Sequence, residues 1–173
     1  MKRFKKILVG VDLSQGDRYV SDRLPEPTME AVDRAIWLAK TNSARITYCY
    51  ALHISARAQH MIEDDPGDHH DVIHEAQDVL RRLAAQAADE GVTAETVVPC
   101  GKPSAEMIRL VVHQGHDLLI AGTRHHTALE LALFGRTGNN LLRGCPCPVW
   151  ITRPQRDPRI QTILVAHCLR EVG

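Results

Sequence analysis

Short apolar runs alternate with segments of helical period along the chain. Apolar runs rich in β-branched residues occupy residues 7–11, 46–52, 117–121 and 148–152, and residues 92–98 alternate apolar with polar side chains. Continuous apolar runs of this length are typical of strands that are buried on both faces, and alternation is typical of a half-buried strand. The pattern therefore predicts five strands.

The segments between these strands have apolar positions every three or four residues. This spacing predicts helices over residues 28–41 and 72–87, a third one after Pro103, and a short one around residues 139–143. Pro25 and Pro27 are expected just before the first helix. Alternating strands and helices predict the α/β class, with a doubly wound, open, parallel five-stranded sheet that has helices on both faces.

Two connections are longer than usual, and the chain end carries a partial repeat. Residues 15–27 are charged and contain proline, which predicts a surface excursion, and the polar residues 53–68 predict a long loop. Residues 160–169 resemble the opening run of the chain and would add a C-terminal strand. We therefore expect one domain over residues 1–153, followed over residues 154–173 by a linker and the first-strand remnant of a second module, as in a truncated tandem protein.

Composition narrows the classes of function. The 173 residues are 44% hydrophobic and suit one domain, and 21 basic residues balance 21 acidic ones. This balance and the 4% aromatic content argue against a nucleic-acid partner. The apolar run after the basic start ends at Asp12, too soon for a signal peptide or membrane span, and five sparse cysteines suit reduced thiols. We expect a cytoplasmic protein without a membrane partner.

Candidate chemistry gathers where the predicted strands end. Ligands of doubly wound sheets lie beyond the carboxyl ends of the strands, which places Asp12, Ala51 and Gly122 at one edge. The loop after Gly122 and a helix that opens at Gly135 offer backbone N–H groups to an anion. Taken singly, each glycine also suits a plain turn, and Asp12 also suits a cap on the turn that follows it.

Other candidate residues favour structural interpretations. His70 and His74 lie one helical turn apart, but no cysteine completes a metal-ligand set nearby, so no metal site is predicted. His125 and His126 have no nucleophile at a recognisable spacing, so no catalytic residue is assigned and the chain is not expected to be an efficient enzyme. The Cys145-Pro146-Cys147 segment has one residue between its thiols, whereas redox and zinc motifs have two.

Several of these segments together resemble the universal stress protein family. The resemblance rests on residues 7–14 (Ile-Leu-Val-Gly-Val-Asp-Leu-Ser), Gly101-Lys102-Pro103, residues 116–123 and residues 142–150, and it extends over residues 5–153. It is greatest to the N-terminal module of tandem, E-type members. The resemblance implies a Rossmann-like fold of the adenine nucleotide alpha hydrolase type, a cytoplasmic dimer and, in one branch of the family, ATP in the strand-end groove.

The ATP-binding branch has a motif of Gly, two residues, Gly, nine residues, Gly, and then Ser or Thr. Gly122 and Gly135 match its outer glycines, whereas His125 replaces the middle glycine and Arg136 replaces the Ser or Thr. The side chain of His125 would crowd the phosphates, while Arg136 adds a cationic donor. By resemblance, the nucleotide-binding residues would be Gly10, Asp12, Ala51, Gly122, Thr123, Arg124, His125, Gly135, Arg136 and Thr137.

Two functions follow from this resemblance. The first is a dimeric signalling or adaptor protein of the stress response, with a degraded nucleotide groove and a homodimer contact through residues Val149–Thr152. The alternative is a stress protein that binds ATP or AMP with weak or no hydrolysis. The replacements at His125 and Arg136 favour the first.

Overall fold

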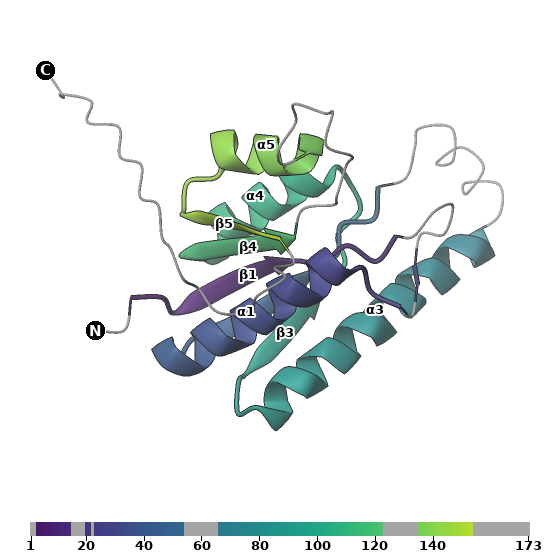
Figure 1. Cartoon of the computed structure of the whole chain (residues 1–173). Helices are drawn as coiled ribbons and strands as arrows, with labels where there is room; N and C mark the ends of the chain where they lie inside the picture. The colour runs from purple at the N-terminus through teal and green to yellow at the C-terminus, as the bar shows by residue number, and fades with distance from the viewer. Residues whose placement is uncertain (1–2, 15–19, 22, 54–65, 123–134, 154–173) are drawn as a thin grey trace, which may run out of the picture.

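Five parallel strands form one sheet in the order β3-β2-β1-β4-β5 (Figure 1). The computed structural model describes residues 3–14, 20–21, 23–53, 66–122 and 135–153, with the backbone alone for residues 66–71. The elements are β1 (Lys6–Gly10), α1 (Glu26–Asn42), β2 (Arg45–Cys49), α3 (Pro66–Asp89), β3 (Ala94–Val97), α4 (Pro103–Gln114), β4 (Leu118–Gly122), α5 (Gly135–Gly144) and β5 (Val149–Thr152).

The chain winds outward from β1 in both directions. It passes from β1 through β2 to β3, returns to the other side of β1 to form β4, and ends the sheet with β5. Since parallel crossovers are right-handed, the reversal places α1 and α3 on one face of the sheet and α4 and α5 on the other, as Figure 1 shows. The predicted doubly wound α/β fold is confirmed.

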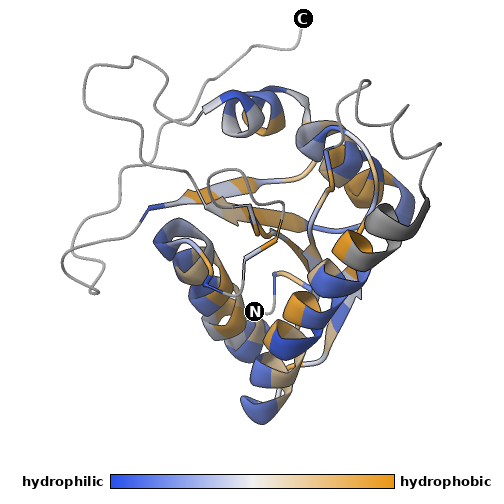
Figure 2. Cartoon of the chain, turned by 90° about the vertical axis from the view of Figure 1, so that its right-hand side faces the viewer, coloured by the Kyte–Doolittle hydropathy of each residue, from blue (hydrophilic) through white to orange (hydrophobic). Residues whose placement is uncertain are grey.

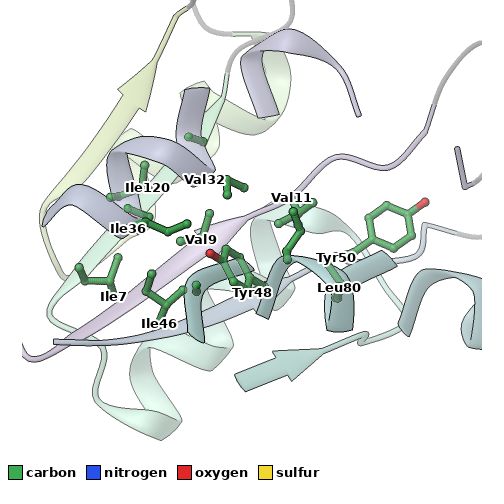
Figure 3. Close-up of a cluster of buried hydrophobic side chains, with 14 of the residues drawn as sticks. Ile7, Val9, Val11, Val32, Ile36, Ile46, Tyr48, Tyr50, Leu80 and Ile120 are labelled. Carbon is green, nitrogen blue, oxygen red and sulfur yellow. The ribbon is translucent and has the colours of Figure 1, made fainter. Parts of the chain in front are cut away.

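A separate apolar core fills each face of the sheet. Ile7 and Val9 of β1 belong to the core under α1 and α3, whereas Leu8 between them belongs to the core under α4 and α5. Figure 3 shows Val32 and Ile36 of α1 in the first of these cores. The strands are mostly apolar and the helices carry both apolar and polar residues (Figure 2), as expected for helices that cover a buried sheet.

Three helices begin earlier than the sequence predicted. Pro25 is the N-cap of α1, so Pro27 lies inside the first turn rather than before the helix. Proline is accepted there because a first-turn N–H has no partner within the helix. Helix α3 begins at Pro66, inside the predicted loop over residues 53–68. Helix α5 begins at Gly135, where the candidate anion site expected a helix to open, and earlier than the apolar spacing around residues 139–143 indicated.

The second and third strands are shorter than predicted. Strand β2 ends at Cys49, and Leu52 beyond it forms only an isolated bridge with Cys100. Strand β3 begins at Ala94 because the Val92 amide instead donates to the Ala87 carbonyl at 2.8 Å, which closes the end of α3. Gly91 in this closure has φ +76°, the left-handed conformation expected of a C-cap glycine.

Some predictions concern residues outside the described parts of the chain. These are the C-terminal strand over residues 160–169, most of the loop over residues 53–68, and residues 15–19 and 22 of the predicted excursion. In the parts that the structure does describe, no helix combines the length and the apolar character needed to cross a membrane.

Candidate functional site

The predicted site residues Gly10, Asp12, Ala51 and Gly122 lie together at the carboxyl ends of the strands. Gly10 is paired in register with Cys49 of β2 on one side and with Ala121 of β4 on the other. Ala51 and Gly122 follow these partners by two residues and one residue, so they lie beside the end of β1. The reversal of winding falls between β1 and β4, and this is the position at which doubly wound sheets hold their ligands.

Asp12 is held in place by two neighbouring side chains. Its Oδ1 accepts hydrogen bonds from the Ser14 amide at 3.1 Å and the Ser14 hydroxyl at 2.8 Å. The Thr28 hydroxyl near the start of α1 donates to the Asp12 carbonyl at 3.2 Å and lies 3.4 Å from the Asp12 amide. The half-buried carboxylate therefore caps the turn after β1, as the structural interpretation expects, and has a fixed position at the edge of the sheet.

Gly122 lies where β4 meets the start of α1. A Cβ atom on Gly122 would be 2.2 Å from the Pro27 carbonyl oxygen, so no larger residue fits unless the backbone moves. A Cβ atom on Gly10 would be 2.8 Å from the flexible end of the Met107 side chain, which can rotate away. Close packing against Pro27 thus explains why this position holds a glycine.

Ala51 is fixed by the segment that leads to α4. The Leu52 amide donates to the Pro99 carbonyl at 2.9 Å, and the Gly101 amide donates to the Leu52 carbonyl at 3.0 Å. Ala51 itself is 4% exposed. It therefore forms part of the covered wall of this edge and leaves little of its own side chain for a ligand.

The first turn of α5 points toward the same edge of the sheet, since a helix that connects parallel strands runs antiparallel to them. Gly135 has φ +65°, Arg136 is exposed and Thr137 is half-buried. Backbone N–H groups at a helix start and a nearby guanidinium favour an anion. The predicted contacts Thr123, Arg124 and His125 lie outside the described residues.

Sequence reasoning missed three residues that shape this edge. Thr28 ties α1 to Asp12, the Pro27 carbonyl abuts Gly122, and Met107 lies over Gly10. Helical periodicity identified Met107 only as a core residue. No local pattern indicates the contacts of Pro27 and Thr28, because they join segments that are far apart in the sequence.

His116 is a buried polar residue at the amino ends of the strands, opposite the candidate site. Its Nε2 lies 3.0 Å from the Thr47 hydroxyl and its Nδ1 lies 3.2 Å from the Leu110 carbonyl oxygen. Burial lowers the pKa of His116 from its usual value, so the neutral ring is favoured. His116 lies two residues before β4, so it is at the amino ends of the strands and away from Asp12. Its buried contacts with Thr47 and Leu110 indicate a structural role.

Metal-ligating side chains do not cluster among the residues that the structure describes: no group of three or more His, Cys, Asp or Glu could hold an ion there. His74 is exposed, and the side chains of His69 and His70 lie outside the described set. Tyr48 and Tyr50 are buried and Trp150 packs against the core, so these aromatic rings contribute to packing.

The winding of the sheet and the residues at its point of reversal define a Rossmann-like α/β domain. The profile of the universal stress protein family matches residues 3–153, and the chain belongs to this family. Universal stress protein E of Photorhabdus laumondii is 27% identical over 170 residues, which cover 96% of this chain and 51% of that protein. The chain thus spans about half the length of this relative. Universal stress protein YxiE of Bacillus subtilis is 26% identical, with 87% of this chain and 99% of that protein covered.

Solved structures share the fold. UspA from Lactobacillus plantarum superposes with a TM-score of 0.68 at 22% identity, covering 87% of this chain and 99% of that one. An Arabidopsis thaliana family member with AMP bound has a TM-score of 0.62 at 15% identity, covering 91% and 96%. A member from Archaeoglobus fulgidus in complex with dAMP has a TM-score of 0.61 at 15% identity, covering 86% and 98%.

Proposed function

We propose that this chain is a stress-response protein of the cytoplasm that binds an adenine nucleoside monophosphate at the carboxyl ends of β1, β2 and β4 and does not turn it over. The observation that carries the proposal is the fixed carboxylate of Asp12 beside the end of β4, at the reversal of the sheet. The family members solved with AMP and dAMP support the ligand class.

Each residue has a distinct part in this proposal. The Asp12 carboxylate accepts hydrogen bonds from ribose hydroxyls, as acidic residues do in related α/β sites. Gly10 and Gly122 allow Met107 and Pro27 to pack closely against the strand ends that support the ligand. Ala51 forms part of the covered wall behind the base. The first turn of α5, with Arg136 and Thr137, binds the phosphate.

The replacements in the glycine motif favour a monophosphate over ATP. By resemblance to the glycine motif, an imidazole at position 125 would crowd a triphosphate chain, whereas a single phosphate needs only the start of α5 and one guanidinium. Hydrolysis also requires a group that activates water. His125 and His126 have no nucleophile at a recognisable spacing, so turnover is not part of the proposal.

Titration calorimetry with AMP, ATP and adenosine tests this function. We expect AMP to bind with a Kd of roughly 1–100 µM and ATP to bind more weakly. Asp12→Ala should weaken AMP binding at least about tenfold, which corresponds to one charge-assisted hydrogen bond of about 1.4 kcal/mol. No heat with AMP under these conditions, or equal affinity of wild type and Asp12→Ala, would refute the proposed site.

Two further variants separate binding from local folding. Ser14→Ala removes the hydroxyl that holds Asp12 but leaves the carboxylate, so its AMP affinity should stay within about threefold of wild type. Arg136→Ala should abolish the preference for AMP over adenosine, because the exposed guanidinium would contact only the phosphate. A loss of adenosine binding in Arg136→Ala would contradict the proposed orientation of the ligand.

A second function, a dimeric adaptor in stress signalling, is favoured by strand β5. Within the described sheet β5 pairs on one side only, with β4, and its Val149, Trp150 and Ile151 are all half-buried. The other edge strand, β3, carries an exposed Glu95. An apolar edge is the better candidate for pairing with a second copy.

Ile151→Pro tests this contact. Ladder hydrogen bonds of a parallel edge strand alternate between neighbour and solvent, and the Leu119 amide already bonds Pro148, so the Ile151 amide points outward. Proline there should remove a donor to the second copy and yield a monomer in sedimentation velocity, whereas Ile151→Val should remain dimeric. A wild-type monomer, or a dimeric Ile151→Pro, would contradict this arrangement.

A further inference from the structure

The connection between α5 and β5 brings two thiols together. Cys145 and Cys147 are half-buried, and their Sγ atoms lie 3.5 Å apart. Neither residue belongs to the candidate nucleotide site. Any chemistry of this pair is therefore independent of whether the chain binds AMP.

Both ends of this connection are held by the fold. The Cys145 amide donates to the Leu141 carbonyl at 2.9 Å, which fixes it to the last turn of α5. The Leu119 amide donates to the Pro148 carbonyl at 3.0 Å, which fixes the other end to β4. Pro146 and Pro148 further restrict the backbone, so the thiols are placed before any reaction begins.

The surroundings of the pair favour two-thiol chemistry over metal binding. A tetrahedral zinc site needs four ligands. Among the side chains described by the structure, no group of three or more His, Cys, Asp or Glu residues could hold a metal ion, here or elsewhere. Both cysteines also pack against the core under α4 and α5, which removes one side of each thiol from water.

We propose that Cys145 and Cys147 form a reversible dithiol–disulfide pair that exchanges with a small-molecule disulfide such as oxidised glutathione. One cysteine, as its thiolate, attacks a sulfur of the glutathione disulfide, forming a mixed disulfide and releasing one glutathione thiolate. The second cysteine gives up its proton and attacks the protein sulfur of the mixed disulfide. The products are the Cys145–Cys147 bond and a second glutathione, so two protein thiols are oxidised and one disulfide is reduced.

The Cys147 thiol of the reduced pair is protonated at neutral pH. Burial and the adjacent Cys145 raise the pKa of the Cys147 thiol to about 12, so Cys147 remains protonated. A protonated thiol reacts slowly with alkylating agents and peroxides. Exchange with the thiol pool is also slow, because only the thiolate attacks a disulfide.

The test uses the full chain with Cys100→Ser and Cys168→Ser, which leaves Cys49, Cys145 and Cys147 of the five cysteines. The folded protein is equilibrated in reduced-to-oxidised glutathione buffers, quenched in acid, unfolded and alkylated with maleimide for mass spectrometry. In oxidising buffer we expect a single alkylated cysteine, no bound glutathione, and a tryptic peptide starting at Gly144 that lacks two hydrogen masses. Retention of all three free thiols in the most oxidising buffer would overturn the proposal, as would two bound glutathiones.

Equilibration in urea shows whether the fold or only the local sequence favours closure. We expect the equilibrium constant for disulfide formation to be at least about tenfold larger in the folded protein than in the unfolded one, because the fold already holds the two thiols together. An equal or smaller constant in the folded protein would overturn the proposal.

Single substitutions supply a matched control. Cys145→Ser and Cys147→Ser in the same background should each accumulate a lasting mixed disulfide with one glutathione, because no second thiol releases it. A mixed disulfide that disappears as fast in these variants as in the parent would contradict the exchange mechanism.

Discussion

The hydroxyl group of Tyr48 is buried without a hydrogen-bond partner among the described residues. The ring lies in the core under α1 and α3 (Figure 3), and burial, followed by the nearby Asp33, raises the pKa of the hydroxyl. An unpaired polar group in such a place lowers stability. Tyr48→Phe keeps the ring and should leave the free energy of unfolding unchanged or raise it by up to about 1 kcal/mol.

Urea denaturation measures this effect. Tyr48→Ala is the matched control and should lose about 3–5 kcal/mol, since it leaves a cavity. A loss above about 1 kcal/mol in Tyr48→Phe would mean that the hydroxyl contributes a hydrogen bond after all.

His116 makes stability depend on pH. Burial lowers its pKa below the usual 6.5, with smaller effects from the Leu110 carbonyl, Lys6, Asp117 and Glu95. Below pH 6.5 the unfolded chain binds a proton at this position and the folded chain does not, so stability falls as pH drops through the folded pKa. Well above pH 6.5 the ring is neutral in both the folded and the unfolded chain, so His116 contributes no pH dependence there.

Comparison with His116→Gln isolates this residue from the other nine histidines. The wild type should be the more stable of the two at pH 7.5, and its advantage should shrink steadily toward pH 5 in urea denaturation. An advantage that is constant or grows on acidification would show that the folded protein accepts the proton at His116.

At the level of elements, the contact between β4 and α1 predicts unequal effects at two strand-end glycines. Gly122→Ala places a Cβ atom 2.2 Å from the Pro27 carbonyl oxygen, so the backbone must shift, and we expect a loss of about 3 kcal/mol. Gly10→Ala meets only the mobile end of Met107 and should lose about 1 kcal/mol or less. Urea denaturation that gives equal losses for both would contradict this tight contact.

The sequence predicts which elements form better than it predicts where they end. The runs around Ile7 and Ile120 are buried on both faces, so hydrophobicity alone identifies the strands. The start of α3 at Pro66 lies in a polar segment with no apolar period to indicate it. Val92 leaves β3 because its amide closes α3. This competition between two elements cannot be recognised in either segment alone.

At the level of the whole molecule, the candidate site was predictable in part. The predicted doubly wound fold places ligands at the carboxyl ends of the strands, and the Asp12-x-Ser14 spacing indicates the turn that holds the carboxylate. The sequence suggested Gly122 as part of an anion loop, but its contact with Pro27 depends on how α1 packs across the sheet. The same limit applies to the 3.5 Å distance between the Cys145 and Cys147 sulfurs, because it depends on α5 and β4 holding both ends of one short segment.

The proposed nucleotide site and the proposed dimer contact lie in different parts of the molecule. The candidate nucleotide site lies at the carboxyl ends of the central strands, whereas β5 forms one edge of the sheet. Asp12→Ala should therefore leave the subunit count unchanged, and Ile151→Pro should leave AMP affinity within about threefold of wild type.

Native mass spectrometry of the full chain with added AMP tests the central claim most directly, because one spectrum reports the subunit count and any bound nucleotide. The account predicts a dimer that carries up to one AMP per subunit. At AMP concentrations near the wild-type Kd, the occupancy should be strongly reduced in Asp12→Ala and nearly unchanged in Ser14→Ala. A wild-type spectrum without nucleotide at saturating AMP, or equal occupancy of wild type and Asp12→Ala, would contradict it.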